Sequence, residues 1–265
     1  MVTRRMDYPE TNNWYTRRLY NRKVEGVVAV SQKIFELLVQ AGVEPKKIRL
    51  IHDGIDPRLF ASAANPRDMN SECVVVGIAA VLEQRKGHRF LLEAARRLKT
   101  QGCRIQYRLA GDGSLRQSLE KDALRLGLKE DVQFCGFVSD IPTFLSQVDI
   151  FVLPSLSEGL GVSVLEAMAA GKAVIASRVG GLAEIVLDGV TGLLVMPGDA
   201  EGLAAAIARL AGDRSLSREM GQRGRARLQE HFTLEQMASK NEAYYYALLG
   251  RSEDRLEGME EGSRL

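Results

Sequence analysis

Two glutamates separated by seven residues, Glu158 and Glu166, are the residues of this chain whose type and spacing best suit chemistry. Gly159 and Gly161 lie between them, and an apolar segment predicted to be a helix begins at about Val162. The first turn of a helix offers unpaired N–H groups and a positive dipole end, which attract anions. The spacing therefore predicts an anion site at the start of this helix, with one carboxylate in the loop and one in the helix.

The Glu166 carboxylate is expected to need hydrogen-bond donors. The helix around it is apolar nearly all round and should therefore be buried. A buried carboxylate without partners costs several kcal/mol. Ser163 lies one turn earlier on the same helix face, and a ligand with paired hydroxyl groups would also supply donors. From the residues alone, a structural carboxylate that caps a neighbouring loop is an equally good interpretation.

Other motifs with established chemistry are incomplete. The segment Gly111–Gly113 does not open a dinucleotide fingerprint, because Arg116 stands where a third glycine belongs. The three histidines, His52, His88 and His231, have no mutual spacing suited to zinc. His52 and His88 could line a ligand cleft, but we favour solvated loop histidines at these two positions.

Strands alternate with amphipathic helices around these candidate residues. Predicted strands cover 73–79, 104–110, 132–134, 150–153, 173–176 and 193–195. Predicted helices cover 88–100, 114–127, 140–147, the Glu166 segment, 182–187, 200–211 and 216–229. This alternation predicts the α/β class, with a doubly wound parallel sheet and right-handed crossovers. Such sheets bind ligands at the carboxyl ends of their strands, and nearly every loop there carries a glycine.

The first sixty residues contain a shorter set of elements. Apolar strands are predicted at 24–30 and 48–51, with a helix at 32–40 that Ser31 caps and Gly42 ends.

The segment 1–23 is basic and aromatic, and it contains the only tryptophan of the chain. Asn12 or Asn13 is expected to cap a helix over Trp14–Lys23. One interpretation is a surface for anionic lipid or a phosphorylated acceptor. The favoured one is a solvated helix that packs through Trp14 and Leu19 on the next strand.

The segment EGLGVSVLEAMAAGKAVIAS, at 158–177, resembles the donor-site signature of glycosyltransferase family 4, whose motif is two glutamates with seven residues between them. The resemblance extends from about Val24 to Leu249, in the family's order, through GVVAVSQKI, IHDGIDPRLF, RKGHRFLLEAA, LAGDGSLRQSLE, FCGFVSDI and VGGLAEIVLDGVTGLLVMPGD. It implies the GT-B fold, here as a Rossmann-like C-terminal domain with a remnant of a second Rossmann-like domain.

The resemblance also implies roles for single residues. Glu158 would contact the donor sugar, and Lys86 would offset the negative charge that grows on the leaving diphosphate. The family often has an arginine where Val81 stands, and Arg85 would point elsewhere if the local strand were regular. The donor-binding residues would be Gly159, Leu160, Gly161, Glu166, Gly111 and Val138, with the backbone after Glu158 on the diphosphate and Glu166 on the ribose hydroxyls.

The domain division follows from the same resemblance. Residues 1–60 would be the remnant of an acceptor-binding N-terminal domain, and 61–235 the donor-binding domain. Residues 236–250 would form a helix that crosses back to the first domain, and 251–265 a disordered tail. Because the strands that open such a first domain are absent from this sequence, we expect the 24–51 block to expose apolar strand edges and to self-associate.

Bulk composition limits the partners. A net charge of +2 argues against a nucleic-acid binder, and no apolar run approaches the length of a membrane span. The three scattered cysteines favour buried free thiols in a reducing cytosol, where a peripheral position at the inner face of the membrane is also conceivable. No D-x-D motif occurs, so we expect neither a metal nor another cofactor.

These inferences lead to one functional expectation and one alternative. The first is a retaining, metal-independent glycosyltransferase that moves a sugar from a UDP- or GDP-linked donor to a glycan, lipid-linked or lipopolysaccharide-type acceptor. The alternative is a nucleotide-sugar-binding module that has no transferase activity without a separate acceptor domain.

Overall fold

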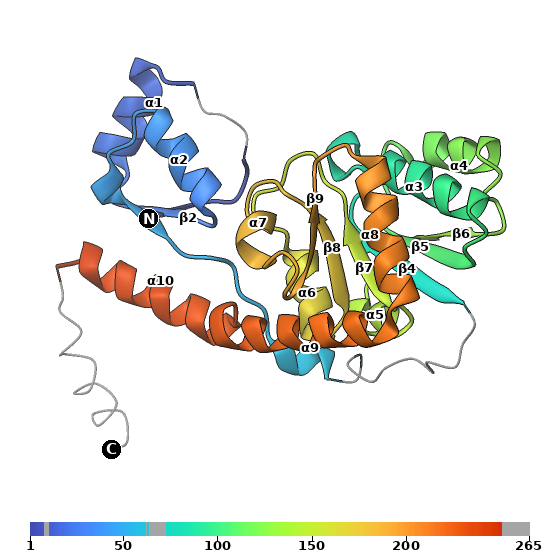
Figure 1. Ribbon diagram of the computed structural model, residues 1–265. Coiled ribbons are helices and arrows are strands. Elements are labelled where there is room, and N and C mark those ends of the chain that lie inside the picture. The colour runs from blue at the N-terminus through green and yellow to red at the C-terminus, as the bar shows by residue number, and fades with distance from the viewer. Residues whose placement is uncertain (8–10, 62, 64–72, 251–265) are drawn as a thin grey trace.

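The computed structural model describes residues 1–7, 11–61, 63 and 73–250 (Figure 1). Within these residues the chain forms a three-stranded and a six-stranded parallel sheet.

The larger sheet has the strand order β6-β5-β4-β7-β8-β9. Its strands are β4 (Val74–Ala79), β5 (Ile105–Ala110), β6 (Val132–Gly136), β7 (Ile150–Leu153), β8 (Ala173–Ser177) and β9 (Gly192–Val195). The chain runs outward from β4 to β6, returns to β7 beside β4, and then runs outward in the other direction. This is the order of a doubly wound Rossmann-like sheet, so the predicted fold class is confirmed.

Helices connect and cover these strands. They are α3 (His88–Thr100), α4 (Arg116–Arg125), α5 (Ile141–Ser146), α6 (Val162–Ala169), α7 (Leu182–Ile185), α8 (Ala200–Gly212) and α9 (Arg214–His231). Helix α3 packs on α8, and α6 packs on α9. Every residue of β7 and β8 is buried, as expected for parallel strands with helices on both faces. Each predicted element of this region is present, with ends that differ by a few residues.

The smaller sheet has the order β1-β2-β3, with strands β1 (Val2–Arg4), β2 (Val27–Ala29) and β3 (Ile48–Leu50). Helix α2 (Gln32–Gln40) follows β2, and the Ser31 hydroxyl caps it as predicted. Strand β1 was not predicted, because its three residues show no apolar alternation. It pairs with β2 along its whole length. The expectation of an open strand edge in the 24–51 block is therefore wrong for β2, whose edge β1 covers.

The packing expected of the basic segment is also wrong. Asn13 does cap helix α1 (Trp14–Arg18), and a π-helical turn, η1 (Leu19–Lys23), continues it. The residues that this segment buries are Thr16 and Tyr20. Trp14 is 73% exposed and Leu19 37% exposed, so neither anchors the helix.

The last helix, α10 (Leu234–Leu248), begins at a capping box in which Thr233 and Gln236 bond each other's backbone N–H groups. Figure 1 shows α9 and α10 as a nearly continuous rod that leads from the larger sheet to the smaller one. The Tyr244 hydroxyl donates to the Lys47 carbonyl over 2.7 Å, and its ring packs on Val28 and Ile51. The predicted tail 251–265 lies outside the described residues.

Two features bear on the predicted compartment. Cys103 is exposed and Cys73 and Cys135 are half-buried, so the expectation of buried thiols is wrong. Among the described residues, no helix combines the length and the apolar character needed to cross a bilayer.

Candidate functional site

The candidate site lies where the chain order of the larger sheet reverses, between the neighbouring strands β4 and β7. The loop after β4 carries Lys86, and the loop after β7 carries Glu158. The Lys86 Nζ donates to Glu158 Oε2 over 2.5 Å, and only 13% and 9% of the two side chains are exposed. A crevice at such a reversal point is the usual ligand site of doubly wound sheets.

Two further groups surround the Glu158 carboxylate. The Ser155 hydroxyl donates to Oε2 over 3.2 Å, and the Arg85 Nη1 lies 4.0 Å from Oε1. Arg85 therefore points toward the site, contrary to expectation. Its loop forms a short 3-10 turn rather than a regular strand. Arg85 also pairs with Glu83, whose Oε1 lies 2.7 Å from the Arg85 Nε, so Lys86 is the cation that lies closest to Glu158. A lysine ammonium is a point charge that suits a phosphate.

The segment Gly159–Gly161 brings bare backbone to the start of α6. Gly161 has φ +100° and precedes the first helical residue, and a Cβ there would lie 2.3 Å from Leu182 Cδ2. Within the part of the chain that the structure describes, no side chain caps α6. The start of α6 therefore has the geometry that an anion site requires, because uncapped N–H groups lie beside a lysine.

The structure places the other predicted donor residues at neighbouring strand ends or in the core. Gly111 follows β5 with φ +135°, and a Cβ there would lie 2.0 Å from the Ala80 carbonyl oxygen. Val138 follows β6 and is partly buried against the core. The Leu160 side chain is buried in that core, so only its backbone can face a ligand.

Glu166 lies on α6 and is half-buried. Among the described residues, no hydrogen bond or ion pair involves its carboxylate, and the expected bond from Ser163 is not formed. Burial raises the pKa of Glu166 to about 7. Within the described residues, the Glu166 carboxylate therefore neither caps a loop nor receives a hydrogen bond from the protein. A ligand with hydroxyl groups could supply the donors that it lacks.

Residues just after β1 contact the loop at 154–161, between β7 and α6, which is called the donor loop below. No pattern in the sequence predicts these contacts. The Ser157 hydroxyl donates to Asp7 Oδ2 over 2.6 Å. A Cβ on Gly159 would lie 2.1 Å from the Arg5 carbonyl oxygen, so only glycine allows this approach. The Arg5 guanidinium pairs with Asp53 over 2.7 Å, which opposes the rise that burial causes in the pKa of Asp53. The donor loop is therefore enclosed from the smaller sheet as well as from the larger one.

Residues 64–227, more than half of the chain, match the family model described as "Glycosyl transferases group 1". The chain belongs to this family. Residues 3–59 match a second model, described as "Glycosyltransferase Family 4". The resemblance inferred from the motifs is thereby confirmed, and Lys86, Glu158 and Glu166 all lie within the group 1 match.

Curated relatives of this group 1 glycosyl transferase carry related names. The lipopolysaccharide core biosynthesis glycosyltransferase LpsE of Rhizobium meliloti is 34% identical over 235 residues, which are 88% of this chain and 66% of the relative. The putative glycosyltransferase EpsD of Bacillus subtilis is 38% identical over 168 residues, which are 62% of this chain and 44% of the relative. The chain thus spans two thirds or less of the length of these relatives.

Solved structures share its fold. The HepE protein of Anabaena, solved with UDP and glucose, is 27% identical with a TM-score of 0.78, over 86% of this chain and 65% of HepE. A glycosyltransferase from Rickettsia africae is 25% identical with a TM-score of 0.83, over 95% of this chain and 71% of that one. These likenesses agree with the GT-B, Rossmann-like organisation of the group 1 family.

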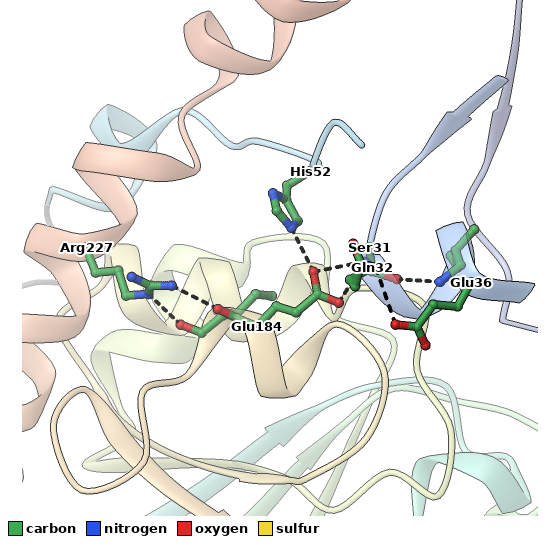
Figure 2. A network of polar contacts seen from close by, with 8 residues as sticks. Ser31, Gln32, Glu36, His52, Glu184 and Arg227 are labelled. Atoms are coloured by element: carbon green, nitrogen blue, oxygen red, sulfur yellow. Dashed lines mark hydrogen bonds and ion pairs between the residues drawn. The ribbon is translucent and has the colours of Figure 1, made fainter. Parts of the chain in front are cut away.

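Sequence reasoning missed a polar network between the two sheets of this group 1 glycosyl transferase (Figure 2). The Glu184 carboxylate accepts the Gln32 backbone N–H through both oxygens, at 2.9 and 3.0 Å, and contacts the His52 Nε2 at 2.9 Å. The VGGLAEIV motif contains Glu184, but no pattern links it to residues 31–52.

The expectation of solvated loop histidines at His52 and His88 is wrong. His52 is half-buried in this network, and His88 at the start of α3 is 1% exposed. Both ring nitrogens of His88 are buried and have no hydrogen-bond partner among the described residues. His231, on α9, is exposed. No cluster of metal-ligating side chains occurs in the part of the chain that the structure describes.

Proposed function

We propose that this chain binds a UDP- or GDP-linked sugar and transfers the sugar to a glycan, lipid-linked or lipopolysaccharide-type acceptor. The observation that carries the proposal is the Lys86–Glu158 pair beside the uncapped start of α6. The names of LpsE and HepE's bound UDP and glucose support the donor and acceptor classes.

The leaving diphosphate is the group that this site suits best. Lys86 offers a point charge, and the Gly159–Gly161 backbone with the first turn of α6 offers N–H donors. These groups stabilise negative charge as it develops on the phosphate oxygens. A bound diphosphate competes with Glu158 for Lys86, which frees the carboxylate to accept hydrogen bonds from the sugar hydroxyls.

We propose retention of configuration by front-face transfer. The acceptor hydroxyl approaches the anomeric carbon on the face from which the diphosphate leaves. The bond from that carbon to the diphosphate oxygen breaks, a bond to the acceptor oxygen forms, and the acceptor proton passes to the departing phosphate. Lys86 and the start of α6 stabilise the negative charge of the diphosphate, so this proposal assigns no step to a metal ion.

The nucleoside half of the donor is assigned to Glu166. Its half-buried carboxylate has no protein partner among the described residues, and two ribose hydroxyls would supply the missing donors. Gly111 and Val138, at the ends of β5 and β6, complete the donor side.

The acceptor side is assigned to the smaller sheet and its basic segment. Trp14 and Tyr15 are 73% and 66% exposed, and the exposed Arg17, Arg18 and Arg22 lie on the same turns. Interfacial aromatic rings beside arginines bind anionic bilayers. We propose that this surface contacts the inner, cytoplasmic face of a membrane that carries the acceptor.

A donor-binding module without autonomous transfer is the second candidate. All residues assigned to the donor lie in the larger sheet and its loops, so this part can bind a nucleotide sugar by itself. Acceptor binding in this case requires a further domain, which a second chain or a longer one would supply.

Calorimetric titration with UDP and GDP, together with donor hydrolysis and transfer assays on a panel of nucleotide sugars, tests these proposals. We expect binding of UDP or GDP that EDTA does not change. Binding without transfer selects the module. If neither UDP nor GDP binds, the donor assignment is refuted. If binding or transfer strictly requires Mg²⁺ or Mn²⁺, metal independence is refuted.

A further inference from the structure

The Glu184 carboxylate joins the two sheets at one point (Figure 2). It lies in α7, in the larger-sheet region, while its partners belong to the smaller-sheet region. Gln32 is the first residue of α2, and its N–H is one of the amides that a helix start leaves unpaired. A carboxylate at this position also meets the positive end of the helix dipole. The side chains of Glu184 and His52 are each only 24% exposed, so water weakens these contacts less than on an open surface.

Helix α7 is fixed directly to the donor loop. A Cβ on Gly180 would lie 1.8 Å from the Glu158 carbonyl oxygen, and Gly180 has φ +47°. The Gly181 N–H donates to the Gly159 carbonyl over 3.2 Å. Because Glu184 follows one turn later, a shift of the α7 backbone also moves the loop that carries Glu158.

A second contact joins the backbone of α7 to helix α9. The Arg227 guanidinium on α9 donates from Nε to the Ile185 carbonyl and from Nη2 to the Glu184 carbonyl, both over 2.9 Å (Figure 2). The carbonyls at the end of a short helix have no partner within the helix, and Arg227 supplies one for each of these two. The backbone of Glu184 is therefore held by the larger-sheet region, and its side chain alone reaches across.

The other side of the contact also touches the donor loop. Ile34, on the first turn of α2, lies 3.6 Å from the position of a Cβ on Gly159. The start of α2 is thus adjacent to the loop that carries the catalytic carboxylate, and Glu184 is the carboxylate that bonds this start.

We propose that Glu184 is a positioning residue, which sets the distance between the donor loop and the acceptor-side helix α2 during sugar transfer. Its bonds to Gln32 and His52 hold the two regions in the register that the reaction needs. This inference rests on the proposed function, and it assigns to Glu184 no contact with the donor or the acceptor.

Proline at position 32 tests the central bond without removing the carboxylate. Gln32→Pro deletes the donating N–H at the first helical position, where proline is well tolerated. The preceding residue, Ser31, is already extended at φ −152° and ψ 160°, as a residue before proline must be. The matched control is Gln32→Ala, which removes the side chain and keeps the N–H.

Hydrogen exchange measured by mass spectrometry reads the contact without any activity. In Gln32→Pro and Glu184→Ala, we expect the hydrogen-bonded amides of the 51–55 and 181–186 segments to exchange at least about fivefold faster. In Gln32→Ala and in Glu201→Gln, a change at an exposed carboxylate on α8, they should exchange as in the parent. Parent-like exchange in both Gln32→Pro and Glu184→Ala overturns the proposal.

Kinetics separate positioning from simple stabilisation. We expect Glu184→Ala to lower the rate of donor turnover about tenfold or more, with the Kd for UDP within about threefold of the parent. Glu184→Gln keeps one acceptor oxygen and should restore part of the rate. Equal losses in UDP affinity and turnover overturn the positioning role. If the parent binds neither UDP nor GDP, the proposed function fails, whereas the exchange experiment still decides whether Glu184 joins the two regions.

Discussion

The Nζ atom of Lys86 lies 2.5 Å from Oε2 of Glu158, although 72 residues separate them in the chain. They meet because β4 and β7 are adjacent strands whose following loops leave the same edge of the sheet. We propose that Lys86 binds a phosphate and that Glu158 binds a sugar. The stability of the fold and the affinity of the site for its ligand should therefore change together when this pair is altered.

Breaking this pair should destabilise the fold. Lys86→Met leaves the nearly buried Glu158 carboxylate with Ser155 and the more distant Arg85, and removal of one partner from a buried pair costs about 3–5 kcal/mol. Adding Glu158→Gln to Lys86→Met should recover most of the loss. Urea denaturation of both single variants and the double variant measures this coupling. Additive effects would contradict an energetic link between the two residues.

Glu166 should make nucleotide-sugar affinity depend on pH. Its pKa is raised to about 7 by burial, and only the ionised form can accept from both ribose hydroxyls. Affinity for UDP-glucose should therefore rise about tenfold between pH 6 and pH 8, following the ionised fraction. Glu166→Ala should bind roughly 10- to 100-fold more weakly at pH 8, and Glu166→Gln should lose the pH dependence. Calorimetry provides the test. The same pH profile in Glu166→Gln would remove Glu166 from the ribose site.

His88 should limit stability in acid. Burial, with the charge of Lys86, lowers its pKa from 6.5 to about 4. The folded state therefore favours neutral His88, and its stability is complete above pH 6.5 and falls as the pH drops toward 4. At pH 4.5 this residue should cost about 2–3 kcal/mol relative to pH 7.5. His88→Gln should flatten the pH dependence in denaturant titrations, whereas the exposed His231→Gln should follow the parent. Identical curves for all three proteins would show that His88 is not the limiting group.

Trp14 reports on the proposed membrane surface, because it is the only tryptophan of the chain. Its emission should shift to shorter wavelength with vesicles that contain phosphatidylglycerol and stay unchanged with phosphatidylcholine alone. The change of Arg17, Arg18 and Arg22 to Gln should abolish the shift, as should high salt. Arg96→Gln, at an exposed position on α3, is the matched control. If the emission of the parent protein does not shift with vesicles that contain phosphatidylglycerol, the proposed membrane surface is refuted.

The larger sheet could be predicted almost completely from the sequence, and the reasons are local. Strands such as Ile150–Leu153 are continuous apolar runs, and loops with glycine and proline separate them from amphipathic helices. The Glu158–Gly161 segment could be assigned to a helix start because glycine ends one element and an apolar run begins the next. The Ser31 and Asn13 caps follow from the same local rules.

Contacts between distant segments could not be predicted in this way. Nothing in the residues around Asp7 indicates that it meets Ser157, because that contact requires both sheets to be in place. Strand β1 lacks an apolar alternation and exists through its pairing with β2. The exposure of Trp14 contradicts the usual preference of large apolar rings for the core, so propensity alone gives the wrong answer there. His52 and His88 fail for a related reason, since burial depends on which elements pack around a loop.

The packing of Tyr244 on Val28 and Ile51 also has a consequence for biosynthesis. The helix that covers these residues of the smaller sheet is synthesised about 200 residues after them. At about 5–20 residues per second, the nascent chain carries this uncovered apolar face for about 10–40 s. These strands of the smaller sheet are thus covered long after they are synthesised, and a molecular chaperone has most to protect during this interval.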